Sequence, residues 1–372
     1  MSSINKLKNW YGKYERPISS ASLVGGFIFD VVTLKRVDLF WENVWVVGHL
    51  VIVAVCILII NSIERGVDDD SGAEALAKAA ANPSTKHFWL VNILQFFFGG
   101  ILSTYLVFYF RSSEISSSWF FLLILAISFW ANEALKRHFV RLIFQISLLF
   151  LSIYAFAIFI VPVILHKMNN WIFLLSGIIS LIIIGLFLLL VKLFAKEIFT
   201  VSKNALLVCV GGIYFLINIL FFLNIIPPIP LSLKDSGVFH SLRRNSLGNY
   251  VVMGEKRGIE KYFVLYQDVH KTLGESVFVY SAIFSPPMLN TNVIHQWQSQ
   301  DKNSGMWVTR QEIILHIVGG REAGFRTYSE RYNVGEGKWR VNVLTRNGQV
   351  IDRIRLNVIL VSEKPKLLEE IK

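Results

Sequence analysis

Long uninterrupted apolar runs fill the first 230 residues of the chain. The clearest of them, residues 171–191, reads WIFLLSGIISLIIIGLFLLLV and contains no charged residue. A helix needs about 20 apolar residues to cross roughly 30 Å of hydrocarbon, so this run is long enough to span a membrane. Only helices and closed barrels satisfy their backbone polar groups in lipid, and a Leu/Ile-rich run without alternation is typical of a helix. The pattern predicts an integral membrane protein.

Six runs of this kind predict membrane-spanning helices, at residues 44–63, 88–110, 119–135, 142–165, 171–191 and 205–226. The last run ends at Pro227-Pro228, where missing backbone N–H groups stop a helix. A further run, 18–34, is at the lower length limit for a span and contains Asp30. It therefore either crosses the membrane or lies re-entrant or interfacial. We expect an α-helical transmembrane bundle of six to seven spans.

Beyond residue 231 the pattern changes to short alternating segments separated by turn residues, which is typical of strands. Strands are predicted at residues 276–284, 291–298, 306–318, 325–332, 338–345 and 350–361. The Asn347-Gly348 pair predicts a tight hairpin turn with positive φ at both residues, and 299–305 predicts a second hairpin. No amphipathic helix separates these segments, so they predict an all-β, antiparallel, sandwich-like C-terminal domain. The last residues, SEKPKLLEEIK, are interpreted as a polar tail.

These patterns divide the chain into three predicted parts. Residues 1–43 form a basic N-terminal head with a short or re-entrant membrane segment, 44–230 a helical transmembrane domain, and 231–372 an extracytoplasmic β-sandwich-like domain. The composition agrees, because 53% of the residues are hydrophobic and the mean hydropathy is +0.51. The net charge of +11 comes from scattered rather than clustered lysines and arginines, so we expect no nucleic-acid partner.

The charges between the apolar runs predict the orientation of the chain. One side carries Lys136, Arg137 and Arg141 together with a loop holding Lys192, Lys196 and Lys203. The other side carries only Arg111 and Lys167. The positive-inside rule makes the first side cytoplasmic, which places the C-terminal domain outside the cytoplasm. The same rule favours seven crossings, because the basic N-terminal head is cytoplasmic if residues 18–34 also cross the membrane. Asp30 within that segment argues against this crossing.

Several segments together resemble a known group of proteins. In the first two thirds they are GGFIFDVVTLKRVD, NNWIFLLSGIISLIIIGLF and NIIPPIPLSLKDSGVFHS. In the last third they are His295-x-Trp297, Arg326-Thr-Tyr-Ser329, Gly337-Lys-Trp339-Arg340-Val341, Asn347-Gly348 and Arg353-Ile-Arg355. This set resembles bacterial polytopic membrane proteins that end in a small β-rich domain of unknown function. The resemblance implies a bacterial inner-membrane protein and no catalytic residues.

Aromatic and basic residues of the strand region form a candidate ligand-binding set. Its members are His295, Trp297, Arg326, Tyr328, Trp339, Arg340, Arg353 and Arg355. Aromatic rings of such a set stack on sugars, and guanidinium groups hold carboxylate or phosphate. Peptidoglycan fragments, lipid head groups or other envelope polymers would suit it. The alternative interpretation is that the tryptophans anchor the core of a sandwich and the arginines are solvated surface charges.

The sequence offers no catalytic constellation. It contains no G-x-S-x-G and no Walker or dinucleotide glycine spacing, and Cys56 and Cys209 both lie in apolar runs. His240, His270, His295 and His316 show no close ligand spacing, so we predict neither a metal nor a cofactor. Asp30 and Glu133 are the acidic residues of the predicted membrane segments. Such groups either mark a pathway or support helix packing.

Two functions are consistent with these features. The leading hypothesis is a non-enzymatic, multi-pass protein of the bacterial inner membrane whose β-domain binds an envelope glycan, a lipid head group or a partner protein. The rival is a transporter or lipid-handling membrane enzyme with its active centre in the helical bundle, supported by Asp30 and Glu133. The lipid bilayer is a partner in both.

Overall fold

The chain folds into two compact units. The computed structural model describes residues 24–34, 38–63, 85–134, 141–256 and 264–372. The first unit, here called the helical unit, comprises described residues within 1–110, 119–164 and 171–223. The second, here called the β-rich unit, comprises 111–118, 165–170 and the described residues of 224–372. The basic head, and residues 18–23 of the predicted segment 18–34, lie outside the described residues.

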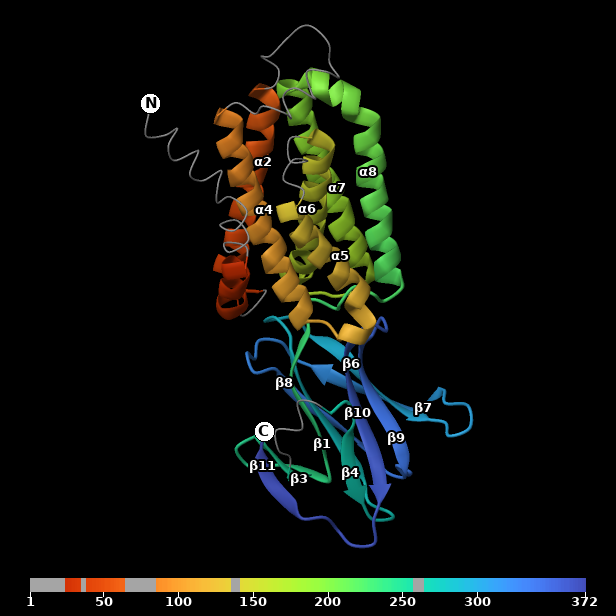
Figure 1. The fold of residues 1–372 in the computed structure, drawn as a ribbon. Helices are drawn as coiled ribbons and strands as arrows, with labels where there is room; N and C mark the ends of the chain where they lie inside the picture. Colours follow the sequence, from red (N-terminus) through yellow and green to blue (C-terminus); the bar gives the residue numbers. More distant parts are fainter. Residues whose placement is uncertain (1–23, 35–37, 64–84, 135–140, 257–263) are drawn as a thin grey trace. The chain divides into compact units, whose positions relative to one another are not determined.

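The helical unit consists of apolar helices that run alongside one another (Figure 1). They are α2 (Phe40–Ile63), α4 (Thr85–Arg111), α5 (Ile115–Ala134), α6 (Leu142–Leu165), α7 (Asn170–Phe194) and α8 (Lys196–Phe222). Among the described residues, five helices (α2, α4, α6, α7 and α8) are long and apolar enough to cross a membrane. This is fewer than the six or seven spans predicted. The described apolar parts of α5, Ser118–Ala131, and of the N-terminal segment, Val24–Thr33, are shorter helices.

Helix α6 lies at the centre of this unit and is held by polar contacts to three neighbours. Asn61 of α2 donates a hydrogen bond to Gln145 over 2.7 Å, and both side chains are buried. Tyr105 and Tyr109 of α4 donate to the carbonyl oxygens of Ser152 and Ala155. Asn218 of α8 donates to the hydroxyl of Tyr154 over 3.1 Å. Such bonds satisfy polar groups in an apolar interior and fix how the helices pack.

The connection between α7 and α8 differs from the prediction. A single residue, Ala195, separates the two helices, where the sequence suggested a loop holding three lysines. Lys192 therefore lies in the last turn of α7, and Lys196 and Lys203 lie within α8. All three side chains are exposed. The backbone of Ala195 lies outside the helical region, with φ −139° and ψ 54°, and this single residue therefore ends one helix and begins the next.

The β-rich unit contains three sheets among its described residues. The strands are β1 (Ser232–Phe239), β2 (Ser241–Arg244), β3 (Tyr250–Glu255), β4 (Gln267–Lys271), β5 (Val277–Phe284), β6 (Thr291–Gln300), β7 (Trp307–Ile317), β8 (Phe325–Arg331), β9 (Gly337–Thr345), β10 (Val350–Leu360) and β11 (Leu367–Ile371). They pair in the orders β1-β5-β8, β4-β10-β9-β6-β7 and β11-β3-β2. The main apolar cluster draws Val238 and Val279 from the first sheet and Val293, Val341 and Leu356 from the five-stranded sheet. These two sheets therefore pack face to face over a common core.

The six predicted strands are confirmed as β5 to β10, with ends that differ by at most two residues. Two other expectations were wrong. The segment interpreted as a polar tail contains β11, which pairs antiparallel with β3. The sheets are not all antiparallel, because β4 pairs parallel with β10, Gln267 lying opposite Leu356. Strands β1 to β4 were also not predicted.

The β9–β10 hairpin is confirmed, but its turn is one residue longer than a two-residue type I′ turn. Gly348 has φ +83°, whereas Asn347 is not in the left-handed region. The Gly348 N–H donates to the carbonyl of Thr345, and the Thr345 N–H donates to the carbonyl of Gln349. This is the three-residue connection in which a type I turn is followed by a left-handed glycine.

Candidate functional site

Three of the predicted binding residues face the core of the β-rich unit. Trp297 is fully buried, Trp339 nearly so, and both belong to the main apolar cluster. His295 and Trp297 do share one face of β6, as predicted, but that face points inward. The interpretation of the tryptophans as core anchors is therefore confirmed. A large ring on an inward position buries more apolar surface than any other side chain, which is why a small sandwich uses it there.

The buried His295 is the centre of a closed hydrogen-bond network. Its Nε2 lies 2.9 Å from the hydroxyl of Ser281, and its Nδ1 lies 2.8 Å from the hydroxyl of Ser329. Trp297 Nε1 donates to the same Ser329 oxygen over 3.0 Å. Burial lowers the pKa of His295 to about 3, because the charged imidazolium loses its hydration. The network therefore holds a neutral histidine and links β6 to β5 and β8.

Arg326 and Tyr328 lie apart from this network, on β8. The Tyr328 ring packs edge-on against Tyr250, with centroids 5.7 Å apart, and also contacts Phe278. The Arg326 guanidinium donates to Asn249 Oδ1 and to the backbone carbonyl of Lys372. Arg326 thus ties β8 to the β2–β3 turn and to the residue that follows β11. The structure does not bring these two residues together with the inward-facing aromatics.

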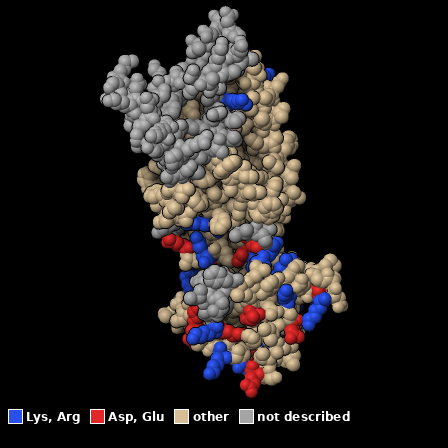
Figure 2. All heavy atoms as spheres, viewed as in Figure 1, with Lys and Arg blue, Asp and Glu red and all other residues tan. Residues whose placement is uncertain are grey.

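Arg340, Arg353 and Arg355 lie on the opposite face of the five-stranded sheet, here called the outer face. Its polar members alternate with the core residues along the strands. They are Gln296 and Gln298 of β6, Trp307, Thr309 and Glu312 of β7, Arg340 and Asn342 of β9, and Arg353 and Arg355 of β10. On the side of the molecule drawn in Figure 2, charged side chains of both signs gather over the β-rich unit, whereas the described helices there are almost entirely uncharged.

Cross-strand hydrogen bonds join the outer-face amides into one row across β7, β6 and β9. Gln296 donates to Glu312 over 2.7 Å and accepts from Asn342 over 2.9 Å. Gln298 accepts from Asn342 and, over 2.7 Å, from Arg340 Nε, and it donates to Thr309. Gln296 and Gln298 each accept through the amide oxygen and donate through the amide nitrogen, whereas Asn342 donates to both of them, so these contacts fix the direction of the three planar groups.

Arg340 is the member of the row that is best placed to contact a ligand. Its guanidinium lies over the indole ring of Trp307, 4.3 Å from the ring centroid. Burial lowers the pKa of Arg340, and the positive charges of Arg353 and Arg355 lower it further. Three guanidinium groups therefore lie close enough to repel one another, and a positive field of this kind favours binding of an anion.

A buried carboxylate from the α4–α5 connection partly neutralises this field. Glu114 forms ion pairs with Arg353 over 3.5 Å and with Arg355 over 3.0 Å. Its side chain is only 6% exposed. Burial raises the pKa of the neighbouring Asp352, and the Glu114 carboxylate adds to that rise. Glu114 thus orients two of the three arginines on this face.

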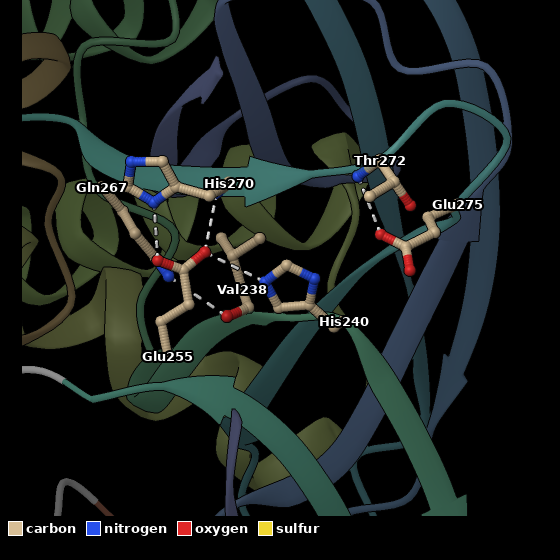
Figure 3. Close-up of polar contacts among 7 residues, drawn as sticks. All are labelled: Val238, His240, Glu255, Gln267, His270, Thr272 and Glu275. Carbon is tan, nitrogen blue, oxygen red and sulfur yellow. Dashed lines mark hydrogen bonds and ion pairs between the residues drawn. The ribbon is translucent and has the colours of Figure 1, made fainter. Parts of the chain in front are cut away.

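A second polar cluster, not predicted from the sequence, joins β3 and β4 (Figure 3). The carboxylate of Glu255 accepts hydrogen bonds from His240 Nε2 (3.0 Å), His270 Nδ1 (2.8 Å) and the His270 backbone N–H (2.7 Å). Burial alone raises the pKa of Glu255, but these hydrogen bonds outweigh it and lower the pKa below its ordinary value. Glu255 is thus an ionised bridge between two imidazoles. The histidines lie 30 positions apart with the acid between them, so no local spacing indicated the cluster.

We expect Glu255→Gln to lower the free energy of unfolding of the β-rich unit by about 2 kcal/mol, because hydrogen bonds to a charged acceptor are lost. Since the pKa of Glu255 is lower in the folded state, this stability is complete above the ordinary carboxyl pKa and is lost as the pH falls through the folded value. Urea unfolding at neutral pH measures the difference. Glu322→Gln, at an exposed loop residue, is the control. Equal effects of the two variants would contradict the bridging role.

Asp30 and Glu133 are the two acidic residues that the sequence placed in membrane segments. Asp30 lies in the short helix Val24–Thr33, where it interacts with His49 of α2. Glu133 lies near the end of α5, and its side chain falls outside the described residues. Over the described parts of the chain, no group of three or more His, Cys, Asp or Glu side chains is arranged to hold a metal ion.

Comparison with known proteins gives one family match. A family model described as "Protein of unknown function (DUF2914)" matches residues 290–358, which begin one residue before β6 and end within β10. No curated protein matches the chain. Among solved structures, an alkylpurine DNA glycosylase, AlkC, from Pseudomonas fluorescens bound to DNA containing an abasic site analog matches with 9% identity and a TM-score of 0.22. That match covers 87% of this chain and 99% of the other, and a score so low carries no argument. The region of the chain that is similar to this family of unknown function therefore includes the outer face.

Proposed function

We propose that this chain is a membrane-anchored envelope protein whose β-rich unit binds a glycan on the outer face of the five-stranded sheet. The observation that carries the proposal is the oriented row of amide and guanidinium groups that ends at Arg340 and Trp307. Planar donors and acceptors in fixed directions suit sugar hydroxyls, and a partly exposed indole ring suits packing against a sugar ring. The arginines favour a glycan that carries carboxylate groups.

The anchoring part of the proposal rests on the helical unit. Five helices have the length and composition to cross a membrane. The exposed Lys192 and Lys196 beside the α7–α8 turn, with Lys203 about two turns into α8, support a cytoplasmic position for that turn. One further helix, α8, then carries the β-rich unit to the outside, in line with the resemblance to bacterial inner-membrane proteins.

Arg340→Ala tests the proposal in the full-length protein in detergent. Removing the guanidinium deletes the hydrogen bond to Gln298 and the contact with Trp307. We expect affinity for carboxylate-bearing peptidoglycan fragments, measured by isothermal titration calorimetry, to fall at least about tenfold. Arg243→Ala is the matched control, because Arg243 is an exposed arginine on β2, in another sheet.

Three outcomes would contradict the proposal. The first is that the wild-type protein binds no fragment, and the second is that Arg243→Ala weakens binding as much as Arg340→Ala. The third is that the protein binds vesicles containing anionic lipid, with the same dependence on Arg340, but no glycan. That last result would assign the outer face to a lipid head group instead.

A further inference from the structure

A small group of polar side chains, two of them buried and one partly buried, lies among the apolar helices of the helical unit. Asp30 belongs to the short helix Val24–Thr33, His49 to α2 and Ser103 to α4. The Asp30 carboxylate interacts electrostatically with His49 and lies close to the Ser103 hydroxyl. His49 is 6% exposed and Ser103 is 2% exposed. Three separate segments therefore bring an acid, a base and a hydroxyl together.

The contacts of the imidazole determine which of its nitrogens carries the hydrogen in the neutral ring. Nδ1 of His49 lies 2.8 Å from the carbonyl oxygen of Trp45. A carbonyl only accepts, so Nδ1 carries the hydrogen and the neutral ring keeps a lone pair on Nε2. The ring packs against Trp45 and Phe97, with centroids 4.6 and 4.8 Å away.

Gly100 of α4 makes room for the imidazole. A Cβ atom at this position would lie 3.1 Å from His49 Nε2, closer than an ordinary van der Waals contact. Gly100 is near the middle of the apolar stretch Leu90–Arg111. The Ser103 hydroxyl, one turn further along α4, is buried and lies close to the Asp30 carboxylate. An acid, a basic nitrogen and a buried hydroxyl thus meet near the middle of a membrane-length helix.

We propose that Asp30, His49 and Ser103 form a proton-binding site within the helical unit. A proton from water adds to the Nε2 lone pair of His49, and the resulting imidazolium forms an ion pair with the Asp30 carboxylate. The only bond that forms on the protein is the Nε2–H bond. Ser103 then donates its hydroxyl hydrogen to the carboxylate. Burial makes either charge costly alone, so the pair is stable as an ion pair or after a proton is exchanged. This role goes beyond glycan binding, which concerns the β-rich unit only.

The helices around His49 carry other charged groups. Glu42 is the acid of α2 and precedes His49 by seven residues. Helix α5 contacts the short helix through Phe27 and Phe129, and it carries Glu133. Lys86 and Arg111 lie at the two ends of α4. Asp30 is the charged group that interacts with His49 within the described residues, so the test is directed at Asp30.

The experiment follows the histidine ring nitrogens by NMR in the full-length, ¹⁵N-histidine-labelled protein in detergent, from about pH 9 to pH 5. His49→Gln identifies the His49 signals by their loss. We expect wild-type His49 to change from the neutral Nδ1–H form to imidazolium within this range. Asp30→Asn should lower the proton affinity of His49 at least about tenfold, because an opposite charge at close range is removed. Glu42→Gln, on the same helix as His49, is the control and should change the affinity much less.

Two results would overturn the proposal. One is a wild-type His49 that stays neutral across the whole range in the folded protein. The other is an equal effect of Asp30→Asn and Glu42→Gln. Should Asp30→Asn fail to fold, Gly100→Ala provides a second test, because the new Cβ must displace the ring. We then expect altered His49 signals and proton affinity, and signals identical to the wild type would contradict the geometry.

Discussion

Replacing Trp297 with alanine is expected to lower the free energy of unfolding of the β-rich unit by about 3 to 5 kcal/mol. The indole is fully buried between the two packed sheets, so its removal leaves a cavity that the neighbouring valines can fill only in part. The hydrogen bond from Nε1 to Ser329 is also lost, which leaves one fewer partner for the His295 network. The change is measured by urea unfolding of the full-length protein in detergent, with the unfolded fraction of the β-rich unit monitored by its susceptibility to proteolysis.

Trp307→Ala is the matched control for this prediction. Trp307 lies on the outer face of the same sheet and is partly exposed, so its loss should cost much less than that of Trp297. If Trp297→Ala costs less than about 1 kcal/mol, or no more than Trp307→Ala, the inward position of Trp297 is wrong. Trp307→Ala should instead weaken glycan binding, so the two variants separate core packing from recognition.

Acidification from pH 6.5 to 5 is expected to destabilise the β-rich unit through His295. Its pKa in the folded state is about 3, below the ordinary value of 6.5. Below pH 6.5 the unfolded chain therefore takes up a proton at this residue while the folded chain does not, so stability is lost as the pH falls. The loss approaches about 1.4 kcal/mol per pH unit and continues until the folded state is also protonated, near pH 3.

The comparison with His295→Gln isolates this contribution. The interval from pH 6.5 to 5 lies above the range in which ordinary carboxylates titrate, so Glu255 and Glu275 contribute little to the slope there. We expect unfolding experiments to show a steep pH dependence for the wild type and a flatter one for His295→Gln. His316→Gln serves as the control, because His316 is exposed on β7. A wild-type stability that does not change over this interval would show that His295 is accessible to protons in the folded state.

The alternation of apolar and polar residues was sufficient to predict the strands around the main core. Every second residue is buried in β6 from Val293 to Ser299 and in β9 from Trp339 to Thr345, where Asn342 is buried as well. That period of two is visible without a structure. Strand β11 gave no such signal, because its residues LLEEI do not alternate and most of them are exposed. It is held instead by backbone pairing with β3. The parallel pairing of β4 with β10 could not be predicted from the sequence either, since it depends on which distant segments meet.

The candidate site was only partly predictable for a related reason. A sequence indicates which residues share a face of a strand, as it did for His295 and Trp297, but not which of the two faces meets a second sheet. Arg340, Arg353 and Arg355 were recognised by their chemistry, and their neighbours Gln296, Gln298 and Asn342 were not. No sequence pattern indicated that Glu114 belongs to the site, because it lies more than 200 positions before its arginine partners.

The pairing of β4 with β10 has a consequence for the order in which this protein is made. Asp268 and Asn357, which are hydrogen-bonded across these strands, are 89 positions apart, and β3 pairs with β11, which lies later still. During synthesis from the N-terminus, β4 therefore emerges long before β10, and β3, although it can pair with β2 at once, emerges long before β11. Because such distant contacts form slowly, the β-rich unit should complete its fold only after its last strand has left the ribosome.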